Sequence, residues 1–329
     1  MMRRRDFFHL TTTFALGAIV GCSRAFAQDS YPTGPIRLIV PFPPGGVVDI
    51  CARYWADRAK AKLGTVVVDN IAGAGGIVGA NNAARSNPDG LTLLFGDSSV
   101  LAIAPALLAQ PPYDPSKDLV PIAMVAHSAS TIAVHPSVPA KTLEEFISYV
   151  RSNQEKVTYA SAGYGTVTHL AGESFKQAIG TPKVLHVPYR GMGPALVDLM
   201  AGVVPMATPN VTQQILDLYR SGKIRILAIC SPHRISAAPE IPTASEVLPG
   251  FVMQLTCGVV APVGVPEPIL SKIASVTEET SKDPSFRRLI EESGLEVSTV
   301  LTPRAAADFW RSEREHLLPI IKSAGLQPQ

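Results

Sequence analysis

Three glycine-rich turns are the segments of this 329-residue sequence most suited to bind a ligand. Each one follows a short β-branched run and precedes a helix-like stretch. The turns are Pro43-Pro44-Gly45-Gly46, Ala72-Gly73-Ala74-Gly75-Gly76 and Ser161-Ala162-Gly163-Tyr164-Gly165-Thr166. Open α/β sheets bind ligands where a strand ends and a helix begins, because unpaired N–H groups at a helix N-terminus attract anions. Three such turns predict a site for an anionic group, although a tight turn alone also explains each glycine.

None of these turns has the spacing of a nucleotide-binding motif. Neither Gly-x-x-x-x-Gly-Lys-Ser/Thr nor Gly-x-Gly-x-x-Gly occurs at them, which argues against ATP and NAD. The histidines at positions 127, 135, 186 and 233 show no metal-ligand spacing. We therefore expect neither a cofactor nor a metal ion.

Gly96-Asp97-Ser98 is the one hint of nucleophilic catalysis, because this tripeptide is typical of a family of serine esterases. That family places the tripeptide near the start of the mature chain and takes its base from an Asp-x-x-His sequence near the end. Here no histidine after residue 27 follows an aspartate by three positions, and no Gly-x-Ser-x-Gly elbow occurs. An esterase that uses Ser98 is a minor alternative, and we expect no enzymatic activity.

The elements that must position these turns alternate between strand and helix. Strands are predicted at 36–40, 66–68, 91–95, 157–160, 184–187 and 224–229. Helices are predicted at 48–63, 79–86, 142–153, 166–179, 194–201, 212–220 and 268–282, and again after 303. Thr142 and Thr243 each precede a glutamate by three residues, which is the capping-box pattern of a helix start. This order predicts an α/β protein in which mixed, mostly parallel sheets are flanked by helices.

Composition and charge exclude several classes of protein. With 46% hydrophobic and 17% charged residues, the chain is an ordinary globular protein rather than a disordered one. Its length suggests two domains, which could enclose a cleft. The 29 Lys and Arg residues barely exceed the 27 Asp and Glu residues, so no nucleic-acid partner is expected.

The N-terminus reads as an export signal. Arg3-Arg4-Arg5-Asp6-Phe7-Phe8 and the short apolar run at 11–20 resemble a twin-arginine signal, and the run is too short to span a membrane. We expect cleavage after Ala27, with lipoprotein processing before Cys22 as the alternative. Cleavage after Ala27 leaves 25 cationic and 26 acidic residues, a net charge of −1. Residues 1–27 are thus predicted to direct a soluble protein to the periplasm.

Three cysteines remain after this cleavage: Cys51, Cys230 and Cys257. At most one pair can form in an oxidising compartment. Two alternatives stay open, a pair between Cys230 and Cys257 and three small buried thiols.

A series of ordered motifs carries a family resemblance along nearly the whole mature chain. The opening Tyr31-Pro32 and the run from Pro35 through Val40-Pro41-Phe42-Pro43-Pro44-Gly45-Gly46 to Asp49 resemble the start of the tripartite tricarboxylate transporter substrate-binding proteins, the Bug or TctC-like family. The resemblance continues through Asn70 and Gly73-Ala74-Gly75-Gly76, Pro88-Asp89-Gly90, Pro112-Tyr113-Asp114-Pro115, Tyr159-Ala160-Ser161 with Gly163, Gly165-Thr166 and His169-Leu170-Ala171-Gly172-Glu173, and His186-Val187-Pro188-Tyr189-Arg190-Gly191.

The resemblance implies a monomeric periplasmic binding protein with two α/β lobes that close on a small organic carboxylate: a dicarboxylate, an aromatic acid or an amino-acid-like compound. The protein would deliver this ligand to a membrane transporter of one large and one small subunit. A sensory role, in which the ligand is presented to a membrane receptor, is the alternative. The implied lobes are residues 31–127 plus 255–329 and residues 128–254.

The family binds its ligand with loops that match defined positions of this chain. We expect ligand contacts from Pro44, Gly45, Gly46, Asp49, Gly75, Gly76, Asp97, Ser98, Ala162, Gly163, Thr166, His169, Tyr189 and Asn210. The chain departs from the family at Gly96-Asp97-Ser98, where Gly-Thr-Ser is usual, at Pro209-Asn210-Val211-Thr212-Gln213, and at Thr256-Cys257-Gly258. We therefore expect an unusual environment for the part of the ligand distal to its carboxylate.

Two acidic residues leave a choice of role. Asp49 either stabilises the dipole of the first helix or bonds to ligand or water. If Asp97 faces the cleft, we predict a ligand with an amine, amide or hydroxyl opposite its carboxylate, because a buried ionised acid needs a donor. Otherwise Asp97 caps a helix or faces solvent.

Overall fold

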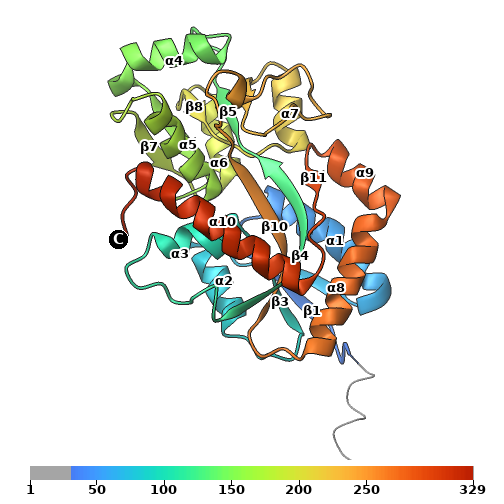
Figure 1. Cartoon of the computed structure of the whole chain (residues 1–329). Coiled ribbons are helices and arrows are strands. Elements are labelled where there is room, and N and C mark those ends of the chain that lie inside the picture. The colour runs from blue at the N-terminus through green and yellow to red at the C-terminus, as the bar shows by residue number, and fades with distance from the viewer. Residues whose placement is uncertain (1–30, 329) are drawn as a thin grey trace, which may run out of the picture. The chain divides into compact units, whose positions relative to one another are not determined.

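The computed structural model describes residues 31–328, so the predicted export signal and both cleavage sites lie outside the described residues. From Pro32 onward the chain forms one unit built on two β-sheets that are covered by helices (Figure 1). Within residues 31–328, no helix is both long enough and apolar enough to cross a membrane.

The N-terminal part of the first sheet is a βαβαβ arrangement. Strand β1 (Ile36–Val40) lies between β2 (Val66–Asn70) and β3 (Thr92–Asp97) and is parallel to both. Helices α1 (Val47–Leu63) and α2 (Ile77–Ala84) make the connections. Because parallel strands end at the same edge of a sheet, the turns after β1 and β3 lie close together.

Antiparallel strands complete the first sheet in the order β11-β4-β10-β3-β1-β2. Strand β10 (Gln254–Pro262) is antiparallel to β3 and to β4 (Leu119–Ala129), and β11 (Glu296–Val297) pairs with β4. The short segments between β3 and β4 are η2 (Ser99–Ile103), a π-helical turn, and α3 (Ala104–Ala106). The C-terminal helices are α8 (Glu267–Lys282), α9 (Pro284–Glu292) and α10 (Pro303–Ser323).

The second sheet has the strand order β7-β6-β8-β5-β9. Its strands are β5 (Thr131–Val134), β6 (Thr158–Ser161), β7 (Leu185–Pro188), β8 (Met206–Ala207) and β9 (Arg225–Ile229). Strand β6 is parallel to β7 and β8, whereas β5 is antiparallel to β8 and β9. The helical segments are α4 (Leu143–Ser152), η3 (Gln154–Lys156), α5 (Val167–Ala178), α6 (Met192–Met200), α7 (Gln213–Arg220) and η4 (Ala244–Glu246).

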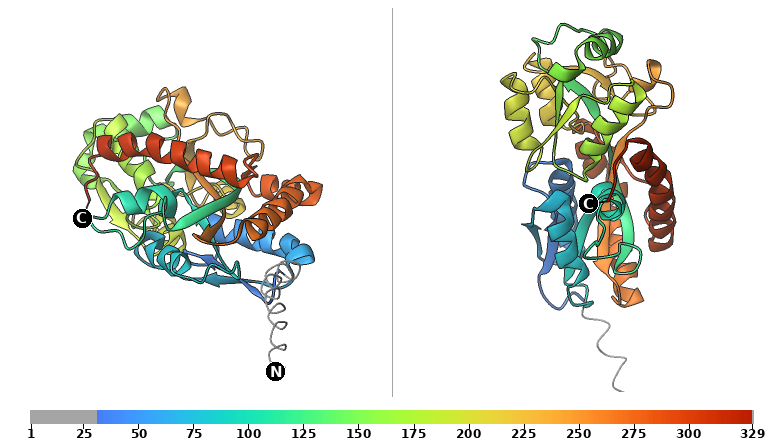
Figure 2. Two further views of the ribbon diagram at one scale, coloured as in Figure 1. Left: turned by 60° about the horizontal axis from the view of Figure 1, so that its bottom comes forward. Right: turned by 90° about the vertical axis from the view of Figure 1, so that its left-hand side faces the viewer.

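The two sheets are linked through β4 and β10, which run from one towards the other (Figure 1). In the right-hand view of Figure 2, the green and yellow elements of the second sheet lie above the blue and teal elements of the first. Helix α10 packs along β4 and η2 of the first sheet and also contacts α5 of the second.

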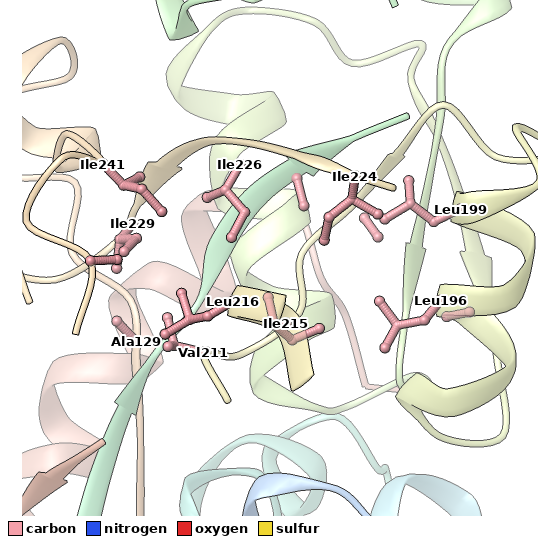
Figure 3. Packing of buried hydrophobic residues seen from close by; sticks show 14 of the residues in the cluster. Ala129, Leu196, Leu199, Val211, Ile215, Leu216, Ile224, Ile226, Ile229 and Ile241 are labelled. Atoms are coloured by element: carbon pink, nitrogen blue, oxygen red, sulfur yellow. The ribbon is translucent and has the colours of Figure 1, made fainter. Parts of the chain in front are cut away.

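A buried cluster, called here the second-sheet cluster, supports the helices of that sheet. It includes Leu196 and Leu199 of α6, Ile215 and Leu216 of α7, and residues of β9 such as Ile226 and Ile229 (Figure 3). Burial of each large aliphatic side chain contributes about 1.5–3 kcal/mol to folding. The cluster therefore holds α6 and α7 against the second sheet.

The predicted α/β fold with mixed sheets and flanking helices is confirmed. More strand pairs are antiparallel than the sequence pattern indicated, because β4, β5 and β10 are joined to their neighbours by long or direct connections rather than by βαβ units. Strands β4, β5, β8, β10 and β11 and helix α9 were not predicted, and the helix expected at Thr243 is only the single turn η4. Cys51, Cys230 and Cys257 are free and buried, and the thiol that interacts with Cys257 is that of Cys51, not Cys230.

Candidate functional site

A cavity of about 320 Å³ lies where strands of both sheets end and helices begin. Residues 42–48 follow β1, Asp97 ends β3, Ala162 follows β6, and the start of α6 follows β7. The lining residues are Phe42, Pro43, Pro44, Gly45, Gly46, Val47, Val48, Asp97, Ser99, Ala162, Thr166, Val167, Thr168, Gly191, Met192, Gly193, Pro194, Leu196, Asn210, Thr212, Gln214, Ile215 and Leu255. This is the position at which α/β sheets bind ligands.

Helix α1 points an uncapped N-terminus at the cavity. Its N-cap residue is Gly46, and no side chain in the described part of the protein caps this end. Gly45 has a φ of +88°, a left-handed conformation that glycine adopts without strain. The first N–H groups of α1 are therefore free to bind an anion.

Asp49 and Asn70 hold the turn before α1 in place from behind. The Gly45 N–H donates to Asp49 Oδ2 (2.9 Å), and Asn70 Nδ2 donates both to the Phe42 carbonyl (2.9 Å) and to Asp49 Oδ1 (2.9 Å). Arg53 forms an ion pair with Asp49 (2.9 Å). Burial alone would raise the pKa of Asp49, but the hydrogen bonds from Arg53, Gly45 and Asn70 together lower it. Asp49 is thus an anionic support of the turn and does not line the cavity.

Helix α6 provides a second uncapped N-terminus. Its N-cap is Gly191, with a φ of +104°, and no described side chain caps this end. A Cβ on Gly191 would lie 3.0 Å from Cγ of Pro43, so the turns before α1 and α6 are in direct contact. The helix ends of α1 and α6 therefore border the same cavity from two different sheets. Each helix end favours a negative group by about 0.3–1 kcal/mol, and by up to ~2 kcal/mol when partly buried.

Helices α5 and α7, in contrast, are capped by the protein itself. Thr166 Oγ1 accepts from the His169 N–H (3.2 Å), and Thr212 Oγ1 accepts from the Ile215 N–H (3.3 Å). The Val167 N–H donates to the hydroxyl of Ser99 (3.1 Å), which belongs to η2 of the first sheet. The third glycine-rich turn thus lines the cavity with Ala162 and Thr166, but α5 has fewer free N–H groups for a ligand than α1 or α6.

Two stacked histidines support the third turn from the side away from the cavity. The ring centroids of His169 and His186 are 4.2 Å apart. His169 Nδ1 accepts from the Gly165 N–H (3.2 Å), and His186 Nε2 lies 2.7 Å from Ser161 Oγ. Burial, with the nearby charge of Lys176, lowers the pKa of His169 to about 4. Burial, followed by the charge of His169, lowers that of His186 to about 3. Both rings are therefore neutral at pH 7 and act as rigid hydrogen-bonding supports.

The cavity brings together seven of the fourteen predicted site residues: Pro44, Gly45, Gly46, Asp97, Ala162, Thr166 and Asn210. The other seven lie outside its lining: Asp49, Gly75, Gly76, Ser98, Gly163, His169 and Tyr189. Gly75 and Gly76 pack against other segments, since a Cβ at these positions would lie 2.3 Å from the Tyr164 carbonyl oxygen and 2.5 Å from Val100 Cγ1. Tyr189 donates its hydroxyl to Asp198 Oδ2 (2.5 Å).

Ser98 is engaged in structural hydrogen bonds. Its hydroxyl accepts from the Thr256 N–H (3.1 Å) and donates to Glu313 Oε1 (3.3 Å). Neither partner is a histidine, so this geometry offers no general base of the kind that a serine esterase uses.

The apolar wall of the cavity was not predicted from the sequence. Phe42, Val48, Met192, Leu196, Ile215 and Leu255 line it, as do the polar residues Ser99, Thr168, Thr212 and Gln214. Five of these lie in the first turn of an α-helix (Val48, Thr168, Met192, Gln214 and Ile215), so a position at a predicted helix start is a signal that could have found them. Leu255 has no such local signal, because β10 reaches the cavity through its pairing with β3 and β4, which are distant from it in sequence.

Among the described residues that line the cavity, Asp97 is the only one with an ionisable side chain. Asp97 is fully buried, accepts from Ser99 Oγ (2.9 Å) and from the Val100 N–H (3.3 Å), and burial raises its pKa to about 7. Both hydrogen bonds are local and tie the Asp97 side chain to the first two residues of η2, while Asp97 also contributes to the cavity wall.

The sequence model of the tripartite tricarboxylate transporter family receptor matches residues 51–326, which is most of the chain. The protein belongs to this receptor family. The Bug protein BugT of Bordetella pertussis is 33% identical over 311 residues, which cover 94% of each chain.

Solved structures agree with this assignment. The receptor resembles the periplasmic binding protein BugD, with a TM-score of 0.85, 32% identity and coverage of 91% of this chain and 100% of that one. It also resembles the R. palustris protein Rpa4515 with adipate, with a TM-score of 0.87, 28% identity and coverage of 91% and 100%. The family resemblance inferred from the sequence motifs is thus confirmed.

Proposed function

We propose that this receptor captures a small organic carboxylate in the 320 Å³ cavity and delivers it to a membrane transporter of one large and one small subunit. The observation that carries the proposal is the pair of uncapped helix N-termini, α1 and α6, that meet at the cavity through Pro43 and Gly191. Unpaired N–H groups bind a carboxylate without a cationic side chain. The adipate complex of the similar R. palustris protein supports the same ligand class.

In the cell, we propose, residues 1–27 direct the chain to the periplasm, where it works as a soluble monomer. Residues 31–127 plus 255–329 form one lobe and residues 128–254 the other, and the ligand is held between them. The receptor catalyses no reaction, since Ser98 lies outside the cavity lining and bonds to Thr256 and Glu313.

Thermal unfolding in the presence of candidate ligands tests this function. The panel contains mono-, di- and tricarboxylates, aromatic acids and amino acids, each paired with its primary amide. A ligand at one hundred times its Kd adds about 2.7 kcal/mol to the free energy of unfolding, which raises the Tm by several degrees. We expect one chemically related group of acids to raise the Tm and the matching amides to have no effect. Equal shifts with acids and amides, or shifts with neutral compounds alone, would contradict carboxylate recognition.

A further inference from the structure

Asp97 is held rigidly at the end of β3, in the wall of the cavity. It is 0% exposed, and its two oxygens accept one hydrogen bond each, from Ser99 Oγ and from the Val100 N–H. Ser99 in turn accepts the N–H of Val167 at the start of α5. Asp97 therefore orients the Ser99 hydroxyl so that it occupies the first N–H of α5, a group that would otherwise be available to an anionic ligand.

No cation compensates the charge of Asp97. Within residues 31–328 it forms no ion pair, in contrast to Asp49, which is paired with Arg53. The charge of Asp97 contributes to raising the pKa values of Tyr113 and Cys257, and the latter lies opposite Asp97 in the sheet register. An ionised Asp97 thus gives the cavity a negative potential on its η2 side.

We propose that Asp97 makes this receptor select ligands with a single net negative charge or none, so that it binds monocarboxylates and zwitterionic amino acids and discriminates against dicarboxylates of the same length. This inference rests on the proposed function, because it presumes a carboxylate at the uncapped ends of α1 and α6. It concerns the second end group of the ligand, the one opposite that carboxylate.

The place of Asp97 in the cavity lining makes this discrimination effective. Asp97 lines the same cavity as the N-terminal ends of α1 and α6, so a second carboxylate held in that cavity shares it with an acid, and like charges repel appreciably in a partly dehydrated site. No Lys, Arg or His among the described lining residues can offset the repulsion. An ammonium group at the same position would instead be attracted to Asp97, and a methyl group would meet the apolar side chains of Val48, Leu196 and Leu255.

Isothermal titration calorimetry with matched ligands tests the proposal. Each set has one chain length from four to eight carbons and contains the monocarboxylate, its ω-amino acid and the dicarboxylate, for example hexanoate, 6-aminohexanoate and adipate. At pH 8.5 we expect the best ligand of the wild-type protein to be a monocarboxylate or amino acid, with the matching dicarboxylate at least tenfold weaker. In Asp97→Asn, which retains the shape and an acceptor for the Val100 N–H, the difference should fall to about threefold or less.

Matched variants separate the charge of Asp97 from other effects. Glu313→Gln removes a half-buried acid that contacts Ser98 but does not line the cavity, and it should leave the ratio of affinities within about twofold of the wild type. Asp97→Thr introduces the residue usual in the family and should behave as Asp97→Asn does. Both Asp97 variants are checked for a cooperative melting transition.

The pH dependence of the wild type is a second measurement that needs no variant. At pH 6.0 Asp97 is mostly protonated while carboxylate ligands remain mostly ionised, so the dicarboxylate penalty should shrink relative to pH 8.5. Of the groups that face Asp97, Tyr113 and Cys257 do not titrate in this window, because their pKa values are raised by burial and, for Cys257, first by Cys51. The pKa of His127, which reaches this region through Thr256, is lowered by burial, and that of Glu313 is raised by burial. The pH comparison is therefore repeated in Glu313→Gln, where the shrinkage of the penalty should persist.

Each outcome separates this inference from the function on which it rests. Wild-type affinity for a dicarboxylate equal to or above that for its monocarboxylate at pH 8.5 would overturn the inference and leave carboxylate binding intact. So would a preference that Asp97→Asn and acidification both leave unchanged. If no acid of any length binds, carboxylate recognition itself is wrong, and the inference fails with it.

Discussion

Two carboxylates near the cavity, Asp49 and Asp97, show how local partners decide the role of an acidic residue. Asp49 accepts hydrogen bonds from Gly45, Asn70 and Arg53, and these lower its pKa in spite of burial. Asp97 has only Ser99 and Val100 as donors, and burial raises its pKa to about 7. Asp49 is therefore an ionised support, whereas Asp97 is a group whose charge changes near neutral pH.

Because the pKa of Asp97 is raised, we expect the stability of the fold to depend on pH. A carboxyl whose folded-state pKa lies above its unfolded value of 3.8 destabilises the fold progressively as pH rises from about 4 to about 7, since the folded state then holds a proton that the unfolded state has lost. Asp97→Asn removes this linkage. We expect the variant to lose less stability than the wild type between pH 5 and pH 8, as measured by denaturant unfolding at both values. A parallel pH dependence in the two proteins would mean that Asp97 does not titrate there.

Substitution of Asp49 should loosen the turn before α1, which this side chain supports. Asp49→Ala leaves the Gly45 N–H without its acceptor and Arg53 without its partner, and we expect a loss of about 2–4 kcal/mol in the free energy of unfolding together with weaker ligand binding. Because the pKa of Asp49 is lowered, its contribution is present above pH 4 and is lost as pH falls below that.

Asp49→Asn is the control for this prediction, since it keeps an acceptor for Gly45 and loses the charge together with the oxygen that accepts from Asn70. Calorimetric affinity within about threefold of the wild type supports a positioning role. An equal loss of affinity in Asp49→Asn and Asp49→Ala would show that the carboxylate itself contacts the ligand.

At the scale of elements, the sequence allowed the helices and strands with strong local signals to be predicted. The βαβαβ run at the N-terminus and the glycine-rich turns after β1 and β6 were found, because glycine, alternating β-branched runs and the threonine cap at Thr142 act within a few residues. Strand β8 and the pairing of β10 with β4 depend on contacts between distant segments, which periodicity does not encode. The same limit explains why Leu255 was missed as a cavity residue, and why Gly75 and Gly76 were expected at the ligand.

Helix α6 offers a test in which two residues one turn apart separate packing from ligand contact. Leu196 and Leu199 both belong to the second-sheet cluster, but only Leu196 also lines the cavity. Truncation of either to alanine should cost about 2–5 kcal/mol of stability, measured by denaturant unfolding. Leu196→Ala should also shift ligand preference towards bulkier acids, whereas Leu199→Ala should retain the wild-type preference. Equal changes of ligand preference in both variants would show that the preference depends on how α6 is positioned and not on the Leu196 side chain in the cavity wall.

At the scale of the whole described chain, the cavity depends on close contacts between turns of the two sheets. Gly75 meets Tyr164, Gly165 meets Ala104, and Gly191 meets Pro43, with approach distances at which a Cβ would be 2.3–3.0 Å from its neighbour. The hydrogen bond from the Val167 N–H to Ser99 lies beside these contacts. Glycine at positions 75, 165 and 191 allows the backbones of the two sheets to approach each other. This approach brings the ends of α1 and α6 within reach of one ligand.

Gly75 tests whether this approach is required for binding. In Gly75→Ala, the new Cβ would lie 2.3 Å from the Tyr164 carbonyl oxygen, so the two turns must separate. We expect at least a tenfold loss of affinity for the best ligand, by calorimetry, and a larger radius of gyration with ligand present, by small-angle X-ray scattering. The matched control is Gly180→Ala, because Gly180 has a φ of +66° against +63° for Gly75 and no described atom lies within 4 Å of its Cβ position. Both substitutions carry the strain of a left-handed alanine, about 1 kcal/mol, but only Gly75→Ala obstructs the contact. If the two variants bind equally well, the contact between Gly75 and Tyr164 is dispensable, and capture depends on the helix ends alone.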